Sequence, residues 1–157
     1  MKSMKIRIIS ISNKCPVWIS QGIDHFLTKF PQSIRPELIE IRSIKKSRDA
    51  SKFLMEEKQK IMDRVDPVNQ LVVLDEKGKS LTSTGFAQRL DNWIVQGKTV
   101  DLVIGGADGL HESLKSDADE LISLSKLTLP HQMARLFLIE ALYRASAILA
   151  NHPYHRS

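Results

Sequence analysis

The residues best suited to chemistry gather near the end of the chain, in the run Asn-His-Pro-Tyr-His-Arg at positions 151–156. Tyr154, His155 and Arg156 place a phenol, an imidazole and a guanidinium next to one another. Such a set offers hydrogen-bond donors, a group that titrates near neutral pH and a permanent positive charge. It can relay a proton, hold an anion and stack on an aromatic ring, so this tail indicates function more than packing.

Two loops further back are suited to binding. The first is Gly-Gly-Ala-Asp-Gly at 105–109, whose glycines allow the backbone to approach a ligand closely. The second spans residues 123–129, where small polar residues alternate with apolar ones. We expect Leu74, Ile104, Leu127 and Leu129 to wall an apolar slot in which a flat adenine is held by main-chain N–H and C=O groups.

The spacing of residues excludes three known motifs. Gly-Lys-Ser at 78–80 resembles the end of a phosphate-binding P-loop, but Val73 stands where that motif needs glycine. The glycines at 105–109 lack the G-x-G-x-x-G spacing and follow the fourth predicted strand, not the first. His131, His152, His155 and Cys15 show no metal-site spacing, so we expect no metal.

Strand-like and helix-like segments alternate along the whole chain. Strands are predicted at 6–11, 37–44, 71–74 and 100–104, with a polar loop at 75–84 and a fifth strand or tight loop within 121–129. This alternation predicts an α/β fold with a parallel sheet covered by helices on both faces. Ligands bind such sheets beyond the carboxyl ends of the strands, so the loops after Leu74, after Ile104 and before Pro130 are the candidate site.

Five helices are expected between these strands, from their apolar spacing and their end residues. They start at Pro16 and stop at Pro31, span 54–65, run from 86 to Gly97, cover 113–119, and start again at Pro130. Their predicted buried faces are Ile19, Ile23, Phe26, Leu27 and Phe30; then Leu54, Lys58, Ile61, Met62 and Val65; then Phe86, Leu90, Trp93 and Ile94. Trp18 and Trp93 are predicted in the core or at an interface.

The last of these helices is apolar around much of its girth, through Leu138, Leu142 and their neighbours. We therefore expect it to pack on its own sheet with one side and on a second copy of the chain with the other. Glu140 and Arg144 stand four apart and predict an intrahelical ion pair. Asn151 and Pro153 predict the end of the helix and an exposed tail beyond it.

Composition narrows the class of protein. A length of 157 residues predicts a single domain, 1–157, and a hydrophobic content of 42% is that of a folded protein. The net charge of +5 favours a polyanionic partner such as nucleic acid, and Lys14, Lys45, Lys46 and Arg48 are candidate phosphate contacts. A lone Cys15, a poor signal peptide and no membrane-length apolar run predict a cytoplasmic protein.

Four stretches carry a family resemblance: Leu-Val-Ile-Gly-Gly-Ala-Asp-Gly-Leu at 102–110, Ser-Leu-Ser-Lys-Leu-Thr-Leu-Pro-His at 123–131, Ala-Leu-Tyr-Arg-Ala at 141–145 and the closing hexapeptide. With them, and with Val-Val-Leu-Asp at 72–75, the chain resembles over its whole length the large-subunit ribosomal RNA methyltransferase H family of the SPOUT superfamily. Many family members carry Pro-Glu where this chain has Ala107-Asp108, while the glycines are kept.

The resemblance implies a C-terminal trefoil knot, a homodimer, and S-adenosylmethionine as methyl donor for N3 of a pseudouridine in 23S ribosomal RNA of assembled ribosomes. By position it implies that Leu74, Gly106 and residues 125–130 contact the donor, with Gly105 and Leu124 beside them. The run at 125–130 comprises Ser125, Lys126, Leu127, Thr128, Leu129 and Pro130.

The tail and the last helix then suit the acceptor side of methyl transfer. His155 would accept or relay the proton that the acceptor nitrogen loses. Arg144 or Arg156 would hold the electron-rich edge of the base, and Tyr154 would stack on the flipped base or hydrogen-bond to it. At a dimer seam, tail and donor pocket would come from different protomers.

Two other classes of function remain open from the sequence. A nucleotide-dependent oxidoreductase needs a phosphate loop after the first strand, where Ser-Asn-Lys-Cys at 12–15 has no glycine. A non-catalytic ribosome-binding factor would also account for the basic charge and the tail.

Overall fold

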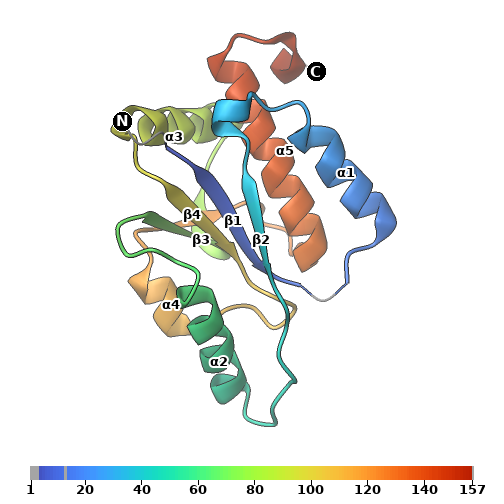
Figure 1. Cartoon of the computed structure of the whole chain (residues 1–157), viewed down its shortest axis with the longest axis vertical. Helices are drawn as coiled ribbons and strands as arrows, with labels where there is room; N and C mark the ends of the chain where they lie inside the picture. The colour runs from blue at the N-terminus through green and yellow to red at the C-terminus, as the bar shows by residue number, and fades with distance from the viewer. Residues whose placement is uncertain (1–3, 13, 157) are drawn as a thin grey trace.

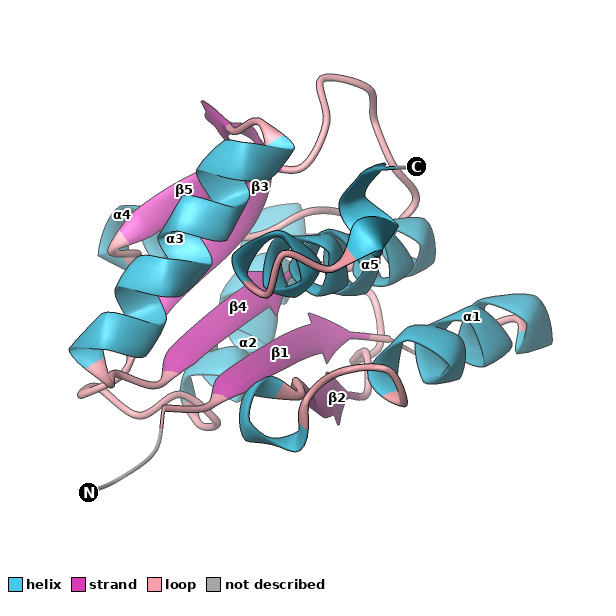
Figure 2. Cartoon of the chain, turned by 90° about the horizontal axis from the view of Figure 1, so that it is seen from above, coloured by secondary structure: helices cyan, strands magenta, loops and turns pink. Residues whose placement is uncertain are grey.

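The structure is a computed structural model, and it describes residues 4–12 and 14–156, with side chains as far as Tyr154. Its centre is a parallel sheet of five strands in the order β2-β1-β4-β3-β5 (Figure 1), all labelled in Figure 2. The strands are β1 Ile6–Ile11, β2 Glu37–Ile41, β3 Gln70–Ser80, β4 Val100–Ile104 and β5 Glu120–Ser123. All four strand pairings are parallel, so the carboxyl ends of β3, β4 and β5 meet at one edge of the sheet.

Helices cover both faces of the sheet, as the alternation of segments predicted (Figures 1 and 2). α1 Val17–Leu27, α3 Ser83–Gln96 and α5 His131–Leu149 pack on one face. α2 Ala50–Met62 and α4 Glu112–Asp117 pack on the other. Two 3-10 turns, η1 Gln32–Ile34 and η2 Pro153–Arg156, complete the elements of the described residues.

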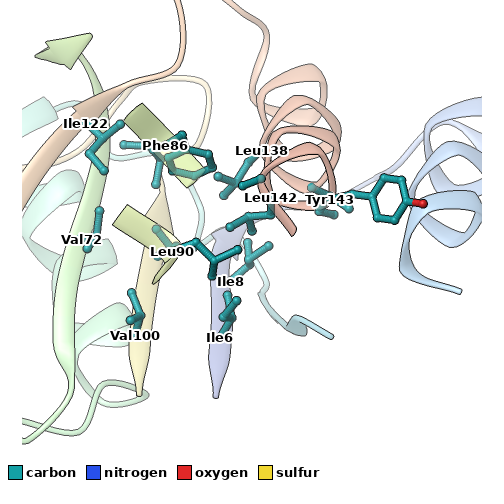
Figure 3. Close-up of a cluster of buried hydrophobic side chains, with 14 of the residues drawn as sticks. Ile6, Ile8, Val72, Phe86, Leu90, Val100, Ile122, Leu138, Leu142 and Tyr143 are labelled. Atoms are coloured by element: carbon teal, nitrogen blue, oxygen red, sulfur yellow. The ribbon is translucent and has the colours of Figure 1, made fainter. Parts of the chain in front are cut away.

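The central strands are buried on both faces, which explains their long apolar runs. Successive side chains of a strand point to opposite faces. Ile6 and Ile8 therefore enter the core under α1, α3 and α5, while Ile9 and Ile11 enter the core under α2 and α4. Figure 3 shows the first of these cores, with strand residues meeting Phe86 and Leu90 of α3 and Leu138 and Leu142 of α5.

Proline and glycine mark the helix ends as predicted. Pro16 and Pro130 directly precede α1 and α5, where a fixed φ and a missing N–H donor cost nothing. Gly97 ends α3 with a φ of 65°, and Asn151 follows α5 with a φ of 54°. Both residue types tolerate this left-handed conformation, which turns the chain away from the helix axis.

Some details of the predicted elements are wrong. α1 ends at Leu27 instead of continuing to Pro31, so Phe30 is buried just beyond the helix. β2 ends at Ile41, three residues before the predicted end. α2 buries Phe53, Glu57 and Ile61, whereas Leu54 and Lys58 of the predicted face are only half-buried. The buried carboxyl of Glu57 interrupts the apolar pattern of the true face. The apolar spacing therefore predicted a face shifted by one residue, through Leu54 and Lys58 instead of Phe53 and Glu57.

The predicted polar loop at 75–84 is also wrong, because β3 continues to Ser80. Ile122 of β5 pairs with Leu74 and again with Lys79, so β3 shifts register and the intervening residues are not paired with β5. Gly78 lies against the neighbouring strand here: a Cβ on it would stand 2.8 Å from backbone atoms of Ile122. The supposed P-loop remnant is therefore a strand segment that needs glycine for close approach.

α5 is buried along most of its length, yet keeps an apolar surface. Leu138, Ile139 and Leu142 are fully buried, whereas Phe137 is 42% exposed. Val17 and Trp18 at the start of α1 are also exposed, while Trp93 is buried in the core. No helix in the described part of the chain is both long and apolar enough to cross a membrane.

Candidate functional site

A cavity of about 670 Å³ lies at the carboxyl edge of β3, β4 and β5, the edge at which a parallel sheet binds ligands. We call it the large cavity. Three connections build it: the start of the β3 register shift, the loop after β4, and the segment from β5 into α5. Its lining residues are Leu74, Asp75, Glu76, Ile104, Gly105, Gly106, Ala107, Asp108, Gly109, Leu110, Leu124, Ser125, Leu127, Thr128, Leu129, Pro130, His131 and Ala134.

The structure brings together nearly all residues predicted for this site. The four predicted slot residues line the large cavity, and so does each residue expected near the donor except Lys126. Lys126 is exposed and is absent from the lining. The chain bends at residues 124, 126 and 127, so neighbouring side chains of this segment point in different directions and position in a run does not guarantee a place in the wall.

The glycine loop is shaped by two close approaches. A Cβ on Gly105 would lie 2.7 Å from the carbonyl oxygen of Gly109 and 2.7 Å from Cγ of Leu110. At Gly106 the nearest atom is Cγ2 of Ile11, at an ordinary 3.4 Å. Gly109 has a φ of 80°, and its N–H donates to the carbonyl of Gly106 at 3.1 Å. The loop therefore needs glycine at 105 for space and at 109 for backbone conformation.

Three carboxylates line the large cavity: those of Asp75, Glu76 and Asp108. The sequence placed Asp75 and Glu76 in a polar loop and gave no reason to assign them to a site. They line the cavity because the register shift of β3 begins directly after Leu74. A wall that combines leucines with carboxylates suits a ligand with an apolar ring and positive charge.

Each of these carboxylates has a polar or charged partner. Lys115 lies 3.4 Å from Asp75, and Lys46 lies 3.2 Å from Asp108 in an exposed pair. Thr128 donates its hydroxyl to Glu76 at 3.2 Å. Burial acts against the charge of Lys115, but the hydrogen bonds and charges of Glu112 and Asp75 prevail and raise its pKa.

The segment from β5 to α5 is held by its own serines. Ser123 donates its hydroxyl to the carbonyl of Ser125 at 2.9 Å, and the Leu127 N–H donates to Oγ of Ser125 at 2.9 Å. These bonds fold the segment into a compact turn over the cavity. Leu127 is nevertheless 77% exposed, so one side of this wall is open.

The tail folds back on α5, so the prediction of an exposed tail is wrong for Tyr154. Its ring is half-buried, packs 4.8 Å from the ring of Tyr143, and lies under the guanidinium of Arg144 at 5.1 Å. The Tyr154 hydroxyl donates to Oε1 of Glu140 at 3.0 Å. η2 includes the backbone of His155 and Arg156, whose side chains lie outside the described residues.

Glu140 is the organising residue of this tail cluster, which consists of Glu140, Arg144 and Tyr154. Arg144 donates to Oε1 of Glu140 through Nε at 3.1 Å and Nη2 at 2.8 Å, which confirms the predicted ion pair. Burial first, and then the hydrogen bond and charge of Glu140, raise the pKa of Tyr154. Tyr154 is therefore a neutral hydroxyl donor near neutral pH and not a base.

A second, smaller cavity of about 210 Å³ lies between the start of α3 and the middle of α5. We call it the small cavity. It is lined by Leu81, Thr82, Ser83, Phe86, Ile122, Ser123, Leu124, Phe137, Glu140, Ala141 and Arg144. Leu124 lines both cavities, whereas Tyr154 lines neither. Within the described residues, no group of three or more His, Cys, Asp and Glu side chains is placed to hold a metal ion.

A parallel α/β sheet with a glycine-lined cavity at its carboxyl edge is an arrangement that binds small organic ligands. Residues 4–155 match the family model described as predicted SPOUT methyltransferase, and the chain belongs to that family of enzymes. This finding confirms the resemblance stated from the sequence.

Named relatives cover the chain almost completely. It is 44% identical over 154 residues to the ribosomal RNA large subunit methyltransferase H of Dechloromonas aromatica (strain RCB), covering 98% of this chain and 99% of that protein. It is 41% identical over 155 residues to the protein of the same name from Nitrosomonas eutropha, covering 98% and 100%.

A solved structure supports the fold alone. The probable methylase family protein from Haemophilus influenzae Rd KW20 is similar with a TM-score of 0.57 and 16% identity. The match covers 95% of this chain and 69% of that one. At this identity the likeness concerns the arrangement of strands and helices.

Proposed function

We propose that this methyltransferase uses S-adenosylmethionine to methylate N3 of a pseudouridine in 23S ribosomal RNA, within assembled ribosomes. The observation that carries the proposal is the large cavity, which gathers the glycine loop and residues 124–130 at the carboxyl edge of the sheet. The names of the relatives, which specify large-subunit ribosomal RNA, supply the substrate class.

The residues present fit this donor. The volume of about 670 Å³ falls in the range of ordinary cofactor pockets. Leu74, Ile104 and Leu129 supply apolar surface for an adenine ring, and the backbone at Gly105 approaches without side-chain obstruction. Asp75, Glu76 and Asp108 complement a ligand that carries positive charge. When bound, S-adenosylmethionine supplies a methyl group already activated on a sulfonium.

With an activated methyl group, the protein has two tasks: to align the acceptor nitrogen and to manage its proton. Arg144 is suited to hold a carbonyl of the base, and Tyr154 to donate a hydrogen bond or to stack. Because the pKa of Tyr154 is raised, we assign it donation rather than proton removal. We assign proton acceptance to His155, with Arg156 contacting base or phosphate.

We propose that the protein acts as a homodimer. Met133 and Phe137 of α5 and Val17 and Trp18 of α1 leave large apolar side chains exposed on two adjacent helices (Figure 1). A second copy covering this surface would remove it from water. Tyr154 lines neither cavity, but it donates its hydroxyl to Glu140, which lines the small cavity.

The proposal also covers the knot, the single cytoplasmic domain and the contacts with ribosomal RNA. Family membership supports a trefoil knot formed by the segment leading into α5, and the chain as a single cytoplasmic domain, 1–157. Lys14, Lys45, Lys46 and Arg48 are proposed phosphate contacts on the ribosome. The pair between Lys46 and Asp108 is exposed on both sides, so an RNA phosphate can compete for this lysine.

The decisive experiment maps methyl groups in ribosomes from cells lacking the protein, before and after purified protein and labelled donor are added. We expect one missing methyl group, on N3 of a large-subunit pseudouridine, that returns with the protein. Unchanged large-subunit RNA would reject the function. Ribosome binding without transfer would favour a non-catalytic factor, and stabilisation by NADH but not by S-adenosylmethionine would favour an oxidoreductase.

A truncation after Asn151 tests the tail separately. It removes Tyr154, His155 and Arg156 while leaving the large cavity intact. We expect a folded dimer that still binds donor and transfers no methyl group. Full turnover by this variant would remove the tail from the mechanism.

A further inference from the structure

The small cavity adjoins the large one through a shared wall. Leu124 lines both, and the hydrogen bond from Ser123 to Ser125 joins a residue of the small cavity to a residue of the large one. Methyl transfer requires the acceptor atom to lie next to the donor methyl. A ring in the small cavity would be adjacent to a donor in the large cavity, so the two cavities are arranged for transfer between them.

The size and walls of the small cavity suit one flat heterocycle. Its volume of about 210 Å³ is below that of pockets for drug-sized ligands. Phe86, Ile122 and Leu124 give apolar surface, while Ser83, Glu140 and Arg144 give polar groups. The carbonyl oxygens of a pyrimidine accept hydrogen bonds, so they match the arginine and serine donors, while a ring N–H outside the edge that is methylated matches the glutamate acceptor.

Glu140 is held in a defined orientation. Its Oε1 accepts two hydrogen bonds from Arg144 and one from Tyr154. Among the hydrogen bonds found in the described part of the chain, none engages the second oxygen, Oε2. A carboxylate fixed through one oxygen is pre-organised to accept a hydrogen bond with the other, without a further loss of side-chain freedom.

We propose that the small cavity binds the target base, and that Glu140 accepts a hydrogen bond from a ring N–H other than the one that is methylated. This inference rests on the proposed function. Pseudouridine differs from uridine by an additional ring N–H, so a carboxylate acceptor in this cavity favours pseudouridine. With uridine the same carboxylate is desolvated without a donor, which is the costly case in polar recognition.

The first test fills the cavity. Ala141 lines the small cavity and not the large one, so Ala141→Leu adds volume at the acceptor side only. We expect donor binding, measured by calorimetry, to stay within twofold of wild type, while methyl transfer to ribosomes falls at least about tenfold. Transfer at the wild-type rate overturns the inference, and so does an equal loss of donor binding.

The second test measures selectivity. Ribosomes carrying either pseudouridine or uridine at the target are methylated by wild type, Glu140→Gln and Glu140→Ala. We expect the preference of wild type for pseudouridine to fall about tenfold to hundredfold in Glu140→Ala, because one hydrogen bond to a charged group is lost. Glu140→Gln keeps a carbonyl acceptor and should retain part of the preference. Asp91→Asn, which removes an exposed carboxylate of α3, is the matched control and should keep all of it.

The ratio of the methylation rates with pseudouridine and with uridine distinguishes a role of Glu140 in base recognition from a purely structural role. A purely structural role of Glu140 lowers the rates with both ribosomes equally and leaves the ratio unchanged, which overturns the inference. A wild type that shows no preference also overturns it. If wild type binds no donor and methylates neither ribosome, the proposed function fails as well, whereas unchanged ratios with an active enzyme reject the inference alone.

Discussion

Gly105→Ala is the sharpest perturbation of the large cavity, because the new methyl group meets atoms that cannot easily move. It would lie 2.7 Å from the Gly109 carbonyl oxygen, which is backbone, and 2.7 Å from Leu110, which is buried. Overpacking of this kind costs about 1–3 kcal/mol. If the loop relieves the strain by moving, ligand affinity weakens by as much as roughly 100-fold, since 1.4 kcal/mol corresponds to tenfold.

Gly106→Ala is the matched control, because its methyl group would meet only Ile11, at 3.4 Å. Thermal unfolding and calorimetric titration with S-adenosylmethionine measure both variants. Gly105→Ala should lower the Tm by roughly 2–4 °C for each kcal/mol lost, and Gly106→Ala should remain near wild type in stability. Equal behaviour of the two variants would refute the steric argument, whichever direction the change takes.

Three further predictions concern other parts of the fold. Tyr154→Phe removes the hydroxyl that donates to Glu140 and should lower the unfolding free energy by about 1 kcal/mol in urea titrations; an unchanged value would contradict a stable tail contact. Arg7→Ala removes the cation 2.9 Å from the fully buried Asp101 and leaves this carboxylate the side-chain hydrogen bond from Asn69. The change should cost about 3–5 kcal/mol, and a loss below about 1 kcal/mol would be inconsistent with a dry site. Burial, and then the charge of Asp108, raise the pKa of Glu57, so this carboxyl supports the fold when protonated and loses that support as pH rises through its folded pKa. Glu57→Gln should match wild type at acid pH and exceed it at neutral pH in thermal melts, and a constant difference across pH would argue against this.

Much of the fold was predictable because its signals are local. Isoleucine and valine runs define β1 and β4, and Pro16, Gly97 and Pro130 define helix ends by their backbone chemistry alone. The β3 register shift was not predictable in this way. Residues 75–80 are polar, and only pairing with β5, some forty residues later in the chain, makes them strand.

The cavity walls were easier to predict than the polar groups within them. Leucines at strand ends must face the same edge of a parallel sheet, so the slot followed from topology. Asp75 and Glu76 enter the cavity where the strand register shifts, which depends on long-range pairing. In the sequence, Glu140 and Arg144 look like any intrahelical ion pair. The contact of Glu140 with Tyr154 could not be predicted, because it depends on the tail turning back onto α5.

The large cavity draws its walls from residues as far apart as 74 and 134, and its final side comes from the last helix to be synthesised. A nascent chain that has not yet formed α5 has no such enclosure, however well the five strands before it are ordered. Ligand binding in the cavity is therefore coupled to completion of the whole fold. A tightly bound small molecule would raise the global free energy of unfolding, because it binds only the folded protein.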